Sequence, residues 1–144
     1  YSPGDMAARI DEAAHATGQP CPRDIGEYIR CINDSLALAY RRAVRQAVEL
    51  SGREVKVLHI VGGGIRNRLL CQLAADATGL PVLAGPAEGT ALGNVVIAAR
   101  GAGVIDGDLS DLRRLIRSSS RLTRYTPDLD TSSNWDDVER RLFG

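Results

Sequence analysis

The chain has 144 residues with 18 basic and 18 acidic side chains, and 44% of its residues are hydrophobic. Length and composition suit one domain with a packed core, while the balanced charge argues against a nucleic-acid surface, which normally carries a basic excess. Three cysteines without a Cys-x-x-Cys pair and two histidines predict neither a disulfide framework nor a metal site. Without a transmembrane span or signal stretch, we expect a soluble, cytoplasmic protein with no membrane partner. Because the chain begins with Tyr1, we expect it to be a piece of a longer protein.

The first half of the chain predicts two helices. Ser2 as N-cap, Pro3 at the first helical position and Asp5 at the third form a capping box for a helix that ends near Thr17. A second, long amphipathic helix is predicted over Asp24–Leu50. Its apolar positions recur at steps of three and four: Ile25, Ile29, Ile32, Leu36, Ala39, Ala43, Ala47 and Leu50. We interpret the polar face of this helix as a solvated or domain-facing surface, and it includes Arg30, Asp34, Arg41 and Arg45.

A strand, a glycine turn and a helix follow. The apolar, β-branched run Val55–Val61 is typical of a buried strand, and Gly62, Gly63 and Gly64 end it. From Asn67 the period changes to that of a helix, which stops at Gly79. One side of this helix is apolar, with Leu69, Leu70, Leu73, Ala74 and Ala77.

Consecutive glycines let the backbone approach a ligand closely, and free amides at the following helix start favour an anion. The pattern therefore indicates a phosphate or nucleotide site, although a tight strand-to-helix turn without a ligand also uses glycines. Neither familiar glycine loop fits. The dinucleotide fingerprint requires glycine where Asn67 stands. The P-loop requires Gly-Lys-Ser/Thr, and the only lysine, Lys56, precedes the glycines.

The second half predicts further short elements. They are a strand Pro81–Ala84, a helix Ala91–Ala102, a basic helix Leu109–Arg117, an extended segment Arg121–Pro127 and a final helix Asn134–Phe143. Glu88, at the start of its helix, fits a structural role beside the helix dipole or the adjacent loop. Asp108 or Ser110 begins the basic helix.

Three runs carry a resemblance to a known family: GEYIRCINDSLALAYR, LHIVGGGIRNRLLCQLAADATGLPVLAGPAEGTALGN and LTRYTPD. They resemble the C-terminal part of the FGGY family of carbohydrate kinases, over nearly the whole chain up to Asp128. The run AGPAEGTALGN is nearer to the members that phosphorylate L-rhamnulose than to those that act on xylulose or glycerol. Tyr28, Cys31 and Asn33 depart from what the wider family usually places in the long helix.

The resemblance implies an α/β fold that is part of an actin-like ATPase (ribonuclease H-like) domain, with short parallel strands and flanking helices. Residues 1–128 would be the C-terminal portion of the second, nucleotide-side domain, and residues 129–144 a tail helix. The three-strand meander that opens such a domain would lie before Tyr1.

The resemblance also implies a site. ATP would meet the triple glycine Gly62, Gly63 and Gly64 at its adenosine and α-phosphate, with the amides of Gly63 and Gly64 near the α-phosphate or ribose. Asn67 would turn its side chain to the purine or the sugar. The Asp-x-Gly-Thr phosphate loop, the catalytic aspartate and the Mg²⁺ ligands would all precede this chain. We therefore expect no catalytic residue and no metal ligand within it.

The parent protein would be an ATP-dependent kinase that phosphorylates L-rhamnulose at its 1-hydroxyl, and the isolated chain would be inactive. The alternatives are another FGGY sugar kinase, acting on fuculose or xylulose, and a non-catalytic actin-like nucleotide-binding module. The two predicted strands make a small sheet with an unpaired edge at Val55–Val61. We therefore expect the isolated chain to self-associate, through that edge or through the long helix.

Overall fold

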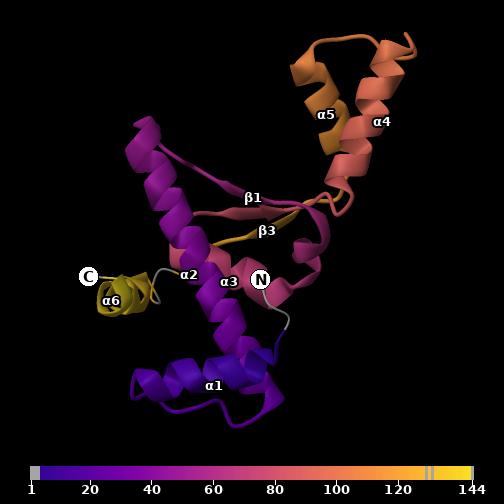
Figure 1. Ribbon diagram of the computed structural model, residues 1–144. Coiled ribbons are helices and arrows are strands. Elements are labelled where there is room, and N and C mark those ends of the chain that lie inside the picture. Colours follow the sequence, from indigo (N-terminus) through magenta and orange to yellow (C-terminus); the bar gives the residue numbers. More distant parts are fainter. Residues whose placement is uncertain (1–3, 129, 131, 144) are drawn as a thin grey trace.

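A computed structural model describes residues 4–128, 130 and 132–143. Within this part, six α-helices accompany a small sheet (Figure 1). The helices are α1 (Met6–Ala16), α2 (Ile25–Ser51), α3 (Arg68–Thr78), α4 (Gly89–Gly101), α5 (Leu109–Ser119) and α6 (Ser132–Phe143). In the described residues, no helix is both long enough and apolar enough to cross a lipid bilayer.

The sheet has three strands in the order β1, β2, β3. The parallel pair that we predicted is present, although β1 (Leu58–Ile60) and β2 (Val82–Ala84) are shorter than expected. The expectation of a two-stranded sheet is wrong, because the extended segment after α5 forms β3 (Thr123–Tyr125) and pairs antiparallel with β2. β2 therefore lies in the middle, and one edge of β1 pairs with no strand in the described part of the chain.

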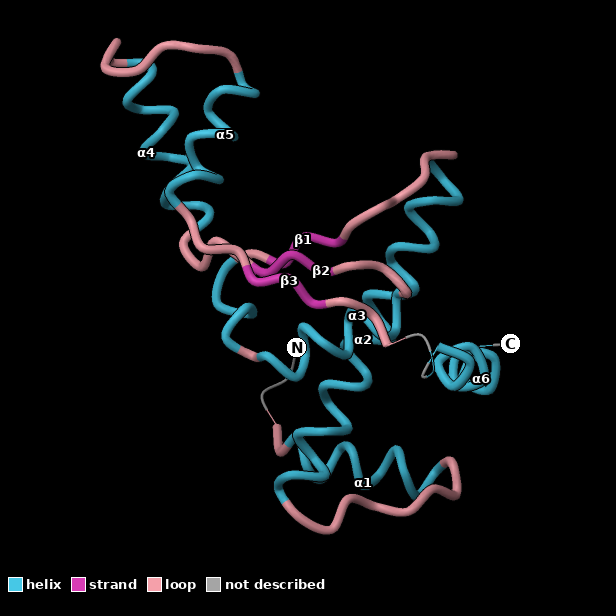
Figure 2. Tube along the Cα trace, turned by 180° about the vertical axis from the view of Figure 1, so that it is seen from behind, coloured by secondary structure: helices cyan, strands magenta, loops and turns pink. Residues whose placement is uncertain are grey.

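Helix α3 packs between the sheet and α2 and forms the centre of the core (Figure 2). The predicted apolar side of α3 is confirmed for Leu70, Leu73, Ala74 and Ala77, which are all buried, whereas Leu69 is exposed. One core cluster joins Ile60, Val82 and Ala84 on a face of the sheet to Cys71, Ala74 and Ala75 of α3. Small side chains on α3 allow both layers to approach its backbone closely.

Helix α1 begins later than predicted. Asp5 is its N-cap and not its third residue, because its carboxylate accepts hydrogen bonds from the amides of Ala7 and Ala8. The predicted cap residues 2 and 3 lie outside the described residues. Tyr28 joins α1 to α2, since its hydroxyl donates to Asp11 Oδ1 at 2.7 Å. This hydrogen bond, together with burial and the charge of Asp11, raises the pKa of Tyr28 to about 12.

Helix α2 has the predicted extent, but the face that we expected to be buried is largely exposed. Ile25 is 75% exposed and Ile29 is 49% exposed, and the rest of that apolar stripe in the N-terminal half is exposed as well. The buried side carries Asn33, Ala37, Leu38 and Arg41 instead. This side faces α3 and α6, where Ala37 packs against Leu73 and Ala77.

Arg41, which we placed on a polar surface, is buried and holds α6 in place. Its guanidinium donates to the Ala77 carbonyl and to Asp136, and its Nε donates to Glu139 at 2.8 Å. Arg45, one turn further along, binds the same two carboxylates at 2.6 and 2.8 Å. The final helix is therefore part of the same packed body.

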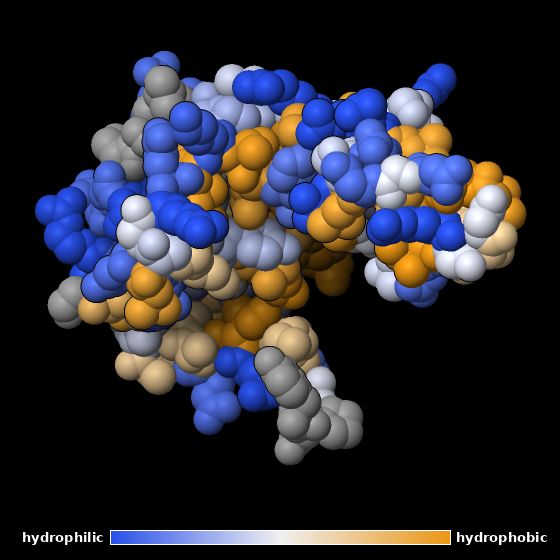
Figure 3. Space-filling view, turned by 90° about the horizontal axis from the view of Figure 1, so that it is seen from above, coloured by the Kyte–Doolittle hydropathy of each residue, from blue (hydrophilic) through white to orange (hydrophobic). Residues whose placement is uncertain are grey.

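Helices α4 and α5 form a hairpin that projects away from the sheet (Figures 1 and 2). Asp108, one of the two residues predicted to begin this helix, is the N-cap of α5 and forms a capping box with Asp111. Glu88 stands at the N-cap position of α4 without a capping hydrogen bond from its side chain. Seen from above, hydrophobic and hydrophilic side chains mix on this projecting arm (Figure 3). Its large exposed apolar residues are Val95, Ile97, Val104, Leu109 and Leu115.

Candidate functional site

The three glycines form a tight turn between β1 and α3. Residues Gly62–Arg66 make a short 3₁₀ helix, and Gly62 has a φ of 78°, a left-handed conformation that glycine adopts at little cost. Asn67 then caps α3, because its Oδ1 accepts a hydrogen bond from the amide of Leu70 at 3.0 Å. The predicted unit of strand, glycine turn and helix is thus present.

The glycine turn lies beside the loop that follows β2. The Gly85 amide donates to the Ile60 carbonyl at 2.8 Å, and the Gly62 amide donates to the Pro86 carbonyl at 3.1 Å. Both loops leave the carboxyl ends of the two parallel strands. In open α/β sheets, ligands bind outside these ends.

The surface of the turn is open at Gly63. A Cβ atom built on Gly63 would have no other heavy atom within 4 Å, although the residue is part of an ordered 3₁₀ helix. The amide of Gly63 stands in the first turn of that helix, before the first amide that can bond back, which is that of Gly64 toward the Val61 carbonyl in the i+3 to i pattern. In the described part of the chain the Gly63 amide has no hydrogen bond to backbone outside the turn. The turn therefore offers the amide of Gly63 and space in front of it, which fits an anionic or sugar oxygen.

Asn67 makes more hydrogen bonds within the protein than we predicted. Besides capping α3, it donates from Nδ2 to Asn33 Oδ1 at 2.8 Å, and its backbone amide donates to the Gly64 carbonyl at 3.1 Å. A side-chain amide has two hydrogens on its nitrogen, so one donor of Asn67 remains for another contact. The sequence revealed Asn67 but not its partner Asn33.

The layer beneath the turn is apolar and closed. Cys71 of α3 is fully buried, and its thiol lies 3.9 Å from the Gly64 carbonyl. Burial raises the pKa of Cys71, so the thiol stays protonated and unreactive. Among the residues described, no three His, Cys, Asp or Glu side chains converge as a metal site would require.

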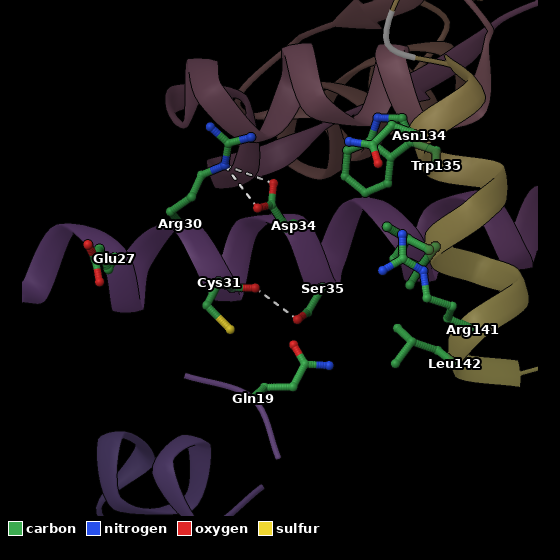
Figure 4. Close-up of a pocket in the computed structure, with 12 residues that line it drawn as sticks. Gln19, Glu27, Arg30, Cys31, Asp34, Ser35, Asn134, Trp135, Arg141 and Leu142 are labelled. Carbon is green, nitrogen blue, oxygen red and sulfur yellow. Dashed lines mark hydrogen bonds and ion pairs between the residues drawn. The ribbon is translucent and has the colours of Figure 1, made fainter. Parts of the chain in front are cut away.

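A separate groove lies between α2 and α6, away from the glycine turn, with a volume of about 550 Å³ (Figure 4). Trp135, Leu142 and Arg141 of α6 line one side, while Cys31 and the Arg30–Asp34 ion pair line the other. None of Gly62, Gly63, Gly64 and Asn67 borders it. Sequence periodicity did not reveal this groove, because it depends on where α6 docks.

The small sheet with its flanking helices is of the actin-like ATPase class, and comparisons with known proteins support this. The chain superimposes on the crystal structure of xylulose kinase from Rhodospirillum rubrum with a TM-score of 0.62 and 26% identity, over 86% of this chain and 25% of that one. Residues 1–102 match the C-terminal domain of the FGGY family of carbohydrate kinases. The chain belongs to this family.

Within the family, the chain is similar to rhamnulokinases. It is 44% identical to the rhamnulokinase of Bacteroides thetaiotaomicron over 94% of its length, and 42% identical to that of Klebsiella pneumoniae strain 342 over 90%. The chain spans about a quarter of the length of these relatives, 27% and 26%. The predicted resemblance and the predicted fold class, part of an actin-like ATPase domain, are both confirmed.

Proposed function

We propose that this chain is the adenosine-side part of an ATP-dependent kinase that phosphorylates L-rhamnulose at its 1-hydroxyl. The observation that carries the proposal is the open glycine turn at the carboxyl ends of β1 and β2, where the Gly63 amide has no backbone partner outside the turn and space in front of it. The similarity to rhamnulokinases over nearly the whole chain supports the choice of sugar. We place the parent protein in the cytoplasm, where ATP and the sugar are both available.

In this proposal the glycine turn binds the nucleotide and does not perform the transfer. ATP would supply the phosphoryl group, and a bound Mg²⁺ would offset phosphate charge, held by ligands that we place outside this chain. Gly63 donates its amide to the α-phosphate or ribose, the backbone of Gly64 lies beside the ligand, Gly62 gives the turn its shape, and Asn67 uses its remaining amide hydrogen toward the purine or ribose. Phosphoryl transfer depends on how the reacting groups are positioned, so a rigid turn that holds ATP in place contributes to the rate.

The test of the proposed function is the sugar preference of the full-length protein. We expect ATP-dependent ADP release with L-rhamnulose at a kcat/KM at least about tenfold above that with fuculose or xylulose, because a matched sugar pocket discriminates in the transition state. Xylulose is the most informative competitor, since one solved structure that the chain resembles is a xylulose kinase. A preference for xylulose or fuculose would assign the chain to another kinase of the family. Absence of any ketose-dependent turnover would favour a non-catalytic nucleotide-binding module.

The isolated 144-residue chain provides a second arm of this test. It forms at most one wall of an ATP cleft, so we expect no ketose-dependent ADP release from it. Activity of the purified chain at a rate comparable with the full-length protein would show that the catalytic base lies within these residues and that the proposed division of roles is wrong.

A further inference from the structure

Asn33 is a buried amide on α2, and both ends of its side chain are hydrogen-bonded. Only 3% of the residue is exposed. Its Nδ2 donates to the Ile29 carbonyl at 2.9 Å, and its Oδ1 accepts from Asn67 Nδ2 at 2.8 Å. A buried amide is costly unless its partners are present, so this pair is a specific feature of the α2–α3 contact.

The second partner of Asn33 belongs to the glycine turn. Asn67 ends the turn and begins α3: its backbone amide binds the Gly64 carbonyl, and its Oδ1 binds the amide of Leu70. With the Oδ1 held by Leu70, the Nδ2 faces Asn33, and the orientation of the side chain is fixed. Asn33 therefore connects the long helix α2 to the turn through one side-chain hydrogen bond.

We propose that Asn33 is a positioning residue for the purine nucleoside triphosphate that binds at the Gly62–Asn67 turn. The inference rests on the proposed function. Asn33 does not touch the nucleotide. It holds Asn67 in one rotamer, so that the second amide hydrogen of Asn67 and the amide of Gly63 keep a fixed geometry before the ligand arrives, which lowers the entropy cost of binding.

A purely structural role for the pair makes a different prediction. If Asn33 only stabilises the α2–α3 contact, its loss lowers the melting temperature and leaves the KM for ATP unchanged in the folded enzyme. A positioning role raises the KM for ATP selectively, because the sugar binds to other parts of the protein.

The variant Asn33→Ser in the full-length protein separates the two roles. A serine hydroxyl can still donate to the Ile29 carbonyl, as Ser35 does to the Cys31 carbonyl at 2.8 Å, but it is too short to reach Asn67. We expect the KM for ATP to rise by about 3- to 10-fold, the effect of one lost hydrogen bond, with the KM for the ketose unchanged. The matched control Ser35→Ala removes a hydrogen bond of the same kind and should leave both KM values unchanged.

A double-mutant cycle tests whether Asn33 acts through Asn67. Asn67→Ala should also raise the KM for ATP mildly, and Asn33→Ser combined with Asn67→Ala should be no worse than Asn67→Ala alone. Fully additive effects would overturn the inference, as would a folded Asn33→Ser enzyme with an unchanged KM for ATP. If Asn33→Ser does not fold, Asn33→Thr, which fills more of the space, takes its place in the same cycle.

The variant Gly63→Val distinguishes failure of this inference from failure of the proposed site. If Gly63→Val raises the KM for ATP and Asn33→Ser does not, the glycine turn binds the nucleotide and Asn33 is only structural. If neither variant changes the KM for ATP, the proposed nucleotide site is wrong, and the role of Asn33 fails with it.

Discussion

The open position of Gly63 makes it the most informative single residue of the site. An added Cβ meets no heavy atom within 4 Å apart from the adjoining backbone, and the φ of Gly63 is not positive. A substitution here should therefore leave the fold intact and act only on what binds in front of the turn.

We predict that Gly63→Val in the full-length protein raises the KM for ATP at least about tenfold, or by ~1.4 kcal/mol, while the KM for the ketose stays near its original value. The side chain would occupy the space that the nucleotide needs. Steady-state kinetics with each substrate varied in turn measure both constants. Gly93→Val is the matched control, because an added Cβ on Gly93 in α4 also meets no atom within 4 Å. Equal effects of the two variants would count against a nucleotide site at the turn.

At the residue scale, the sequence predicted the part of the site that depends on local backbone. Three glycines after a β-branched strand indicate a tight turn, and an asparagine before an apolar helix is a good N-cap. The contact between Asn33 and Asn67 could not be predicted, because it joins residues 34 positions apart. It depends on how α2 crosses α3.

At the element scale, helix α2 shows where periodicity misleads. Its apolar stripe has the correct helical spacing, yet the face toward α3 carries Asn33, Ala37 and Arg41. Small and polar residues do not mark a core face in a sequence, but Ala37 allows close packing, and both polar side chains have hydrogen-bond partners. The ends of α2 were easier to predict, since Asp24 caps one end and Gly52 the other.

We predict that Arg41→Ala destabilises the chain by about 3 kcal/mol, because it removes the buried partner of Asp136, Glu139 and the Ala77 carbonyl. Arg45→Ala is the matched control: it removes the same two carboxylate contacts, but its side chain is 54% exposed, so we expect a loss of less than about 1 kcal/mol. Urea denaturation measures both. Similar losses of unfolding free energy in the two variants would show that the burial of Arg41 adds nothing to stability.

The docking of α6 should also depend on pH. The hydrogen bond from Arg45 and the charge of Arg41 lower the pKa of Asp136 below its ordinary value of 3.8. A lowered pKa in the folded state stabilises the fold at higher pH, so this contribution is complete above about pH 4 to 5 and is lost as the pH falls toward the lowered value. Trp135, the only tryptophan of the chain, lies on α6 and reports its docking.

We therefore expect an acid transition in Trp135 emission below about pH 4, which Asp136→Asn abolishes. Asp137→Asn is the control, because Asp137 pairs with the exposed Arg140 and not with α2. An unchanged transition in Asp136→Asn would mean that another group controls the docking of α6.

At the scale of the whole molecule, the sheet has an open side. Leu58 and Ile60 bond to the β2 side, so the amide and carbonyl of His59 point to the free edge of β1. The third strand β3 extends the sheet at the opposite edge only. The family resemblance led to the correct fold class, whereas strand periodicity alone did not predict the pairing of β3, which lies about 40 residues from β2 in sequence.

We predict that the isolated chain self-associates at micromolar concentration, because a free strand edge and the exposed apolar stripe of α2 are both available. His59→Pro removes the outward amide without breaking a bond to β2 and should shift the chain toward monomer if the edge is responsible. Sedimentation velocity measures the shift. A monomer with strongly protected amides in β1 would contradict the prediction.

The central claim is that the Gly62–Asn67 turn contacts the nucleotide, and hydrogen exchange of the full-length protein tests it most directly. A non-hydrolysable ATP analogue should slow exchange of the Gly63 amide, which has no backbone partner outside the turn in the ligand-free protein, while the ketose alone should not. Unchanged exchange across residues 62–67 at a saturating concentration of the analogue would contradict the account.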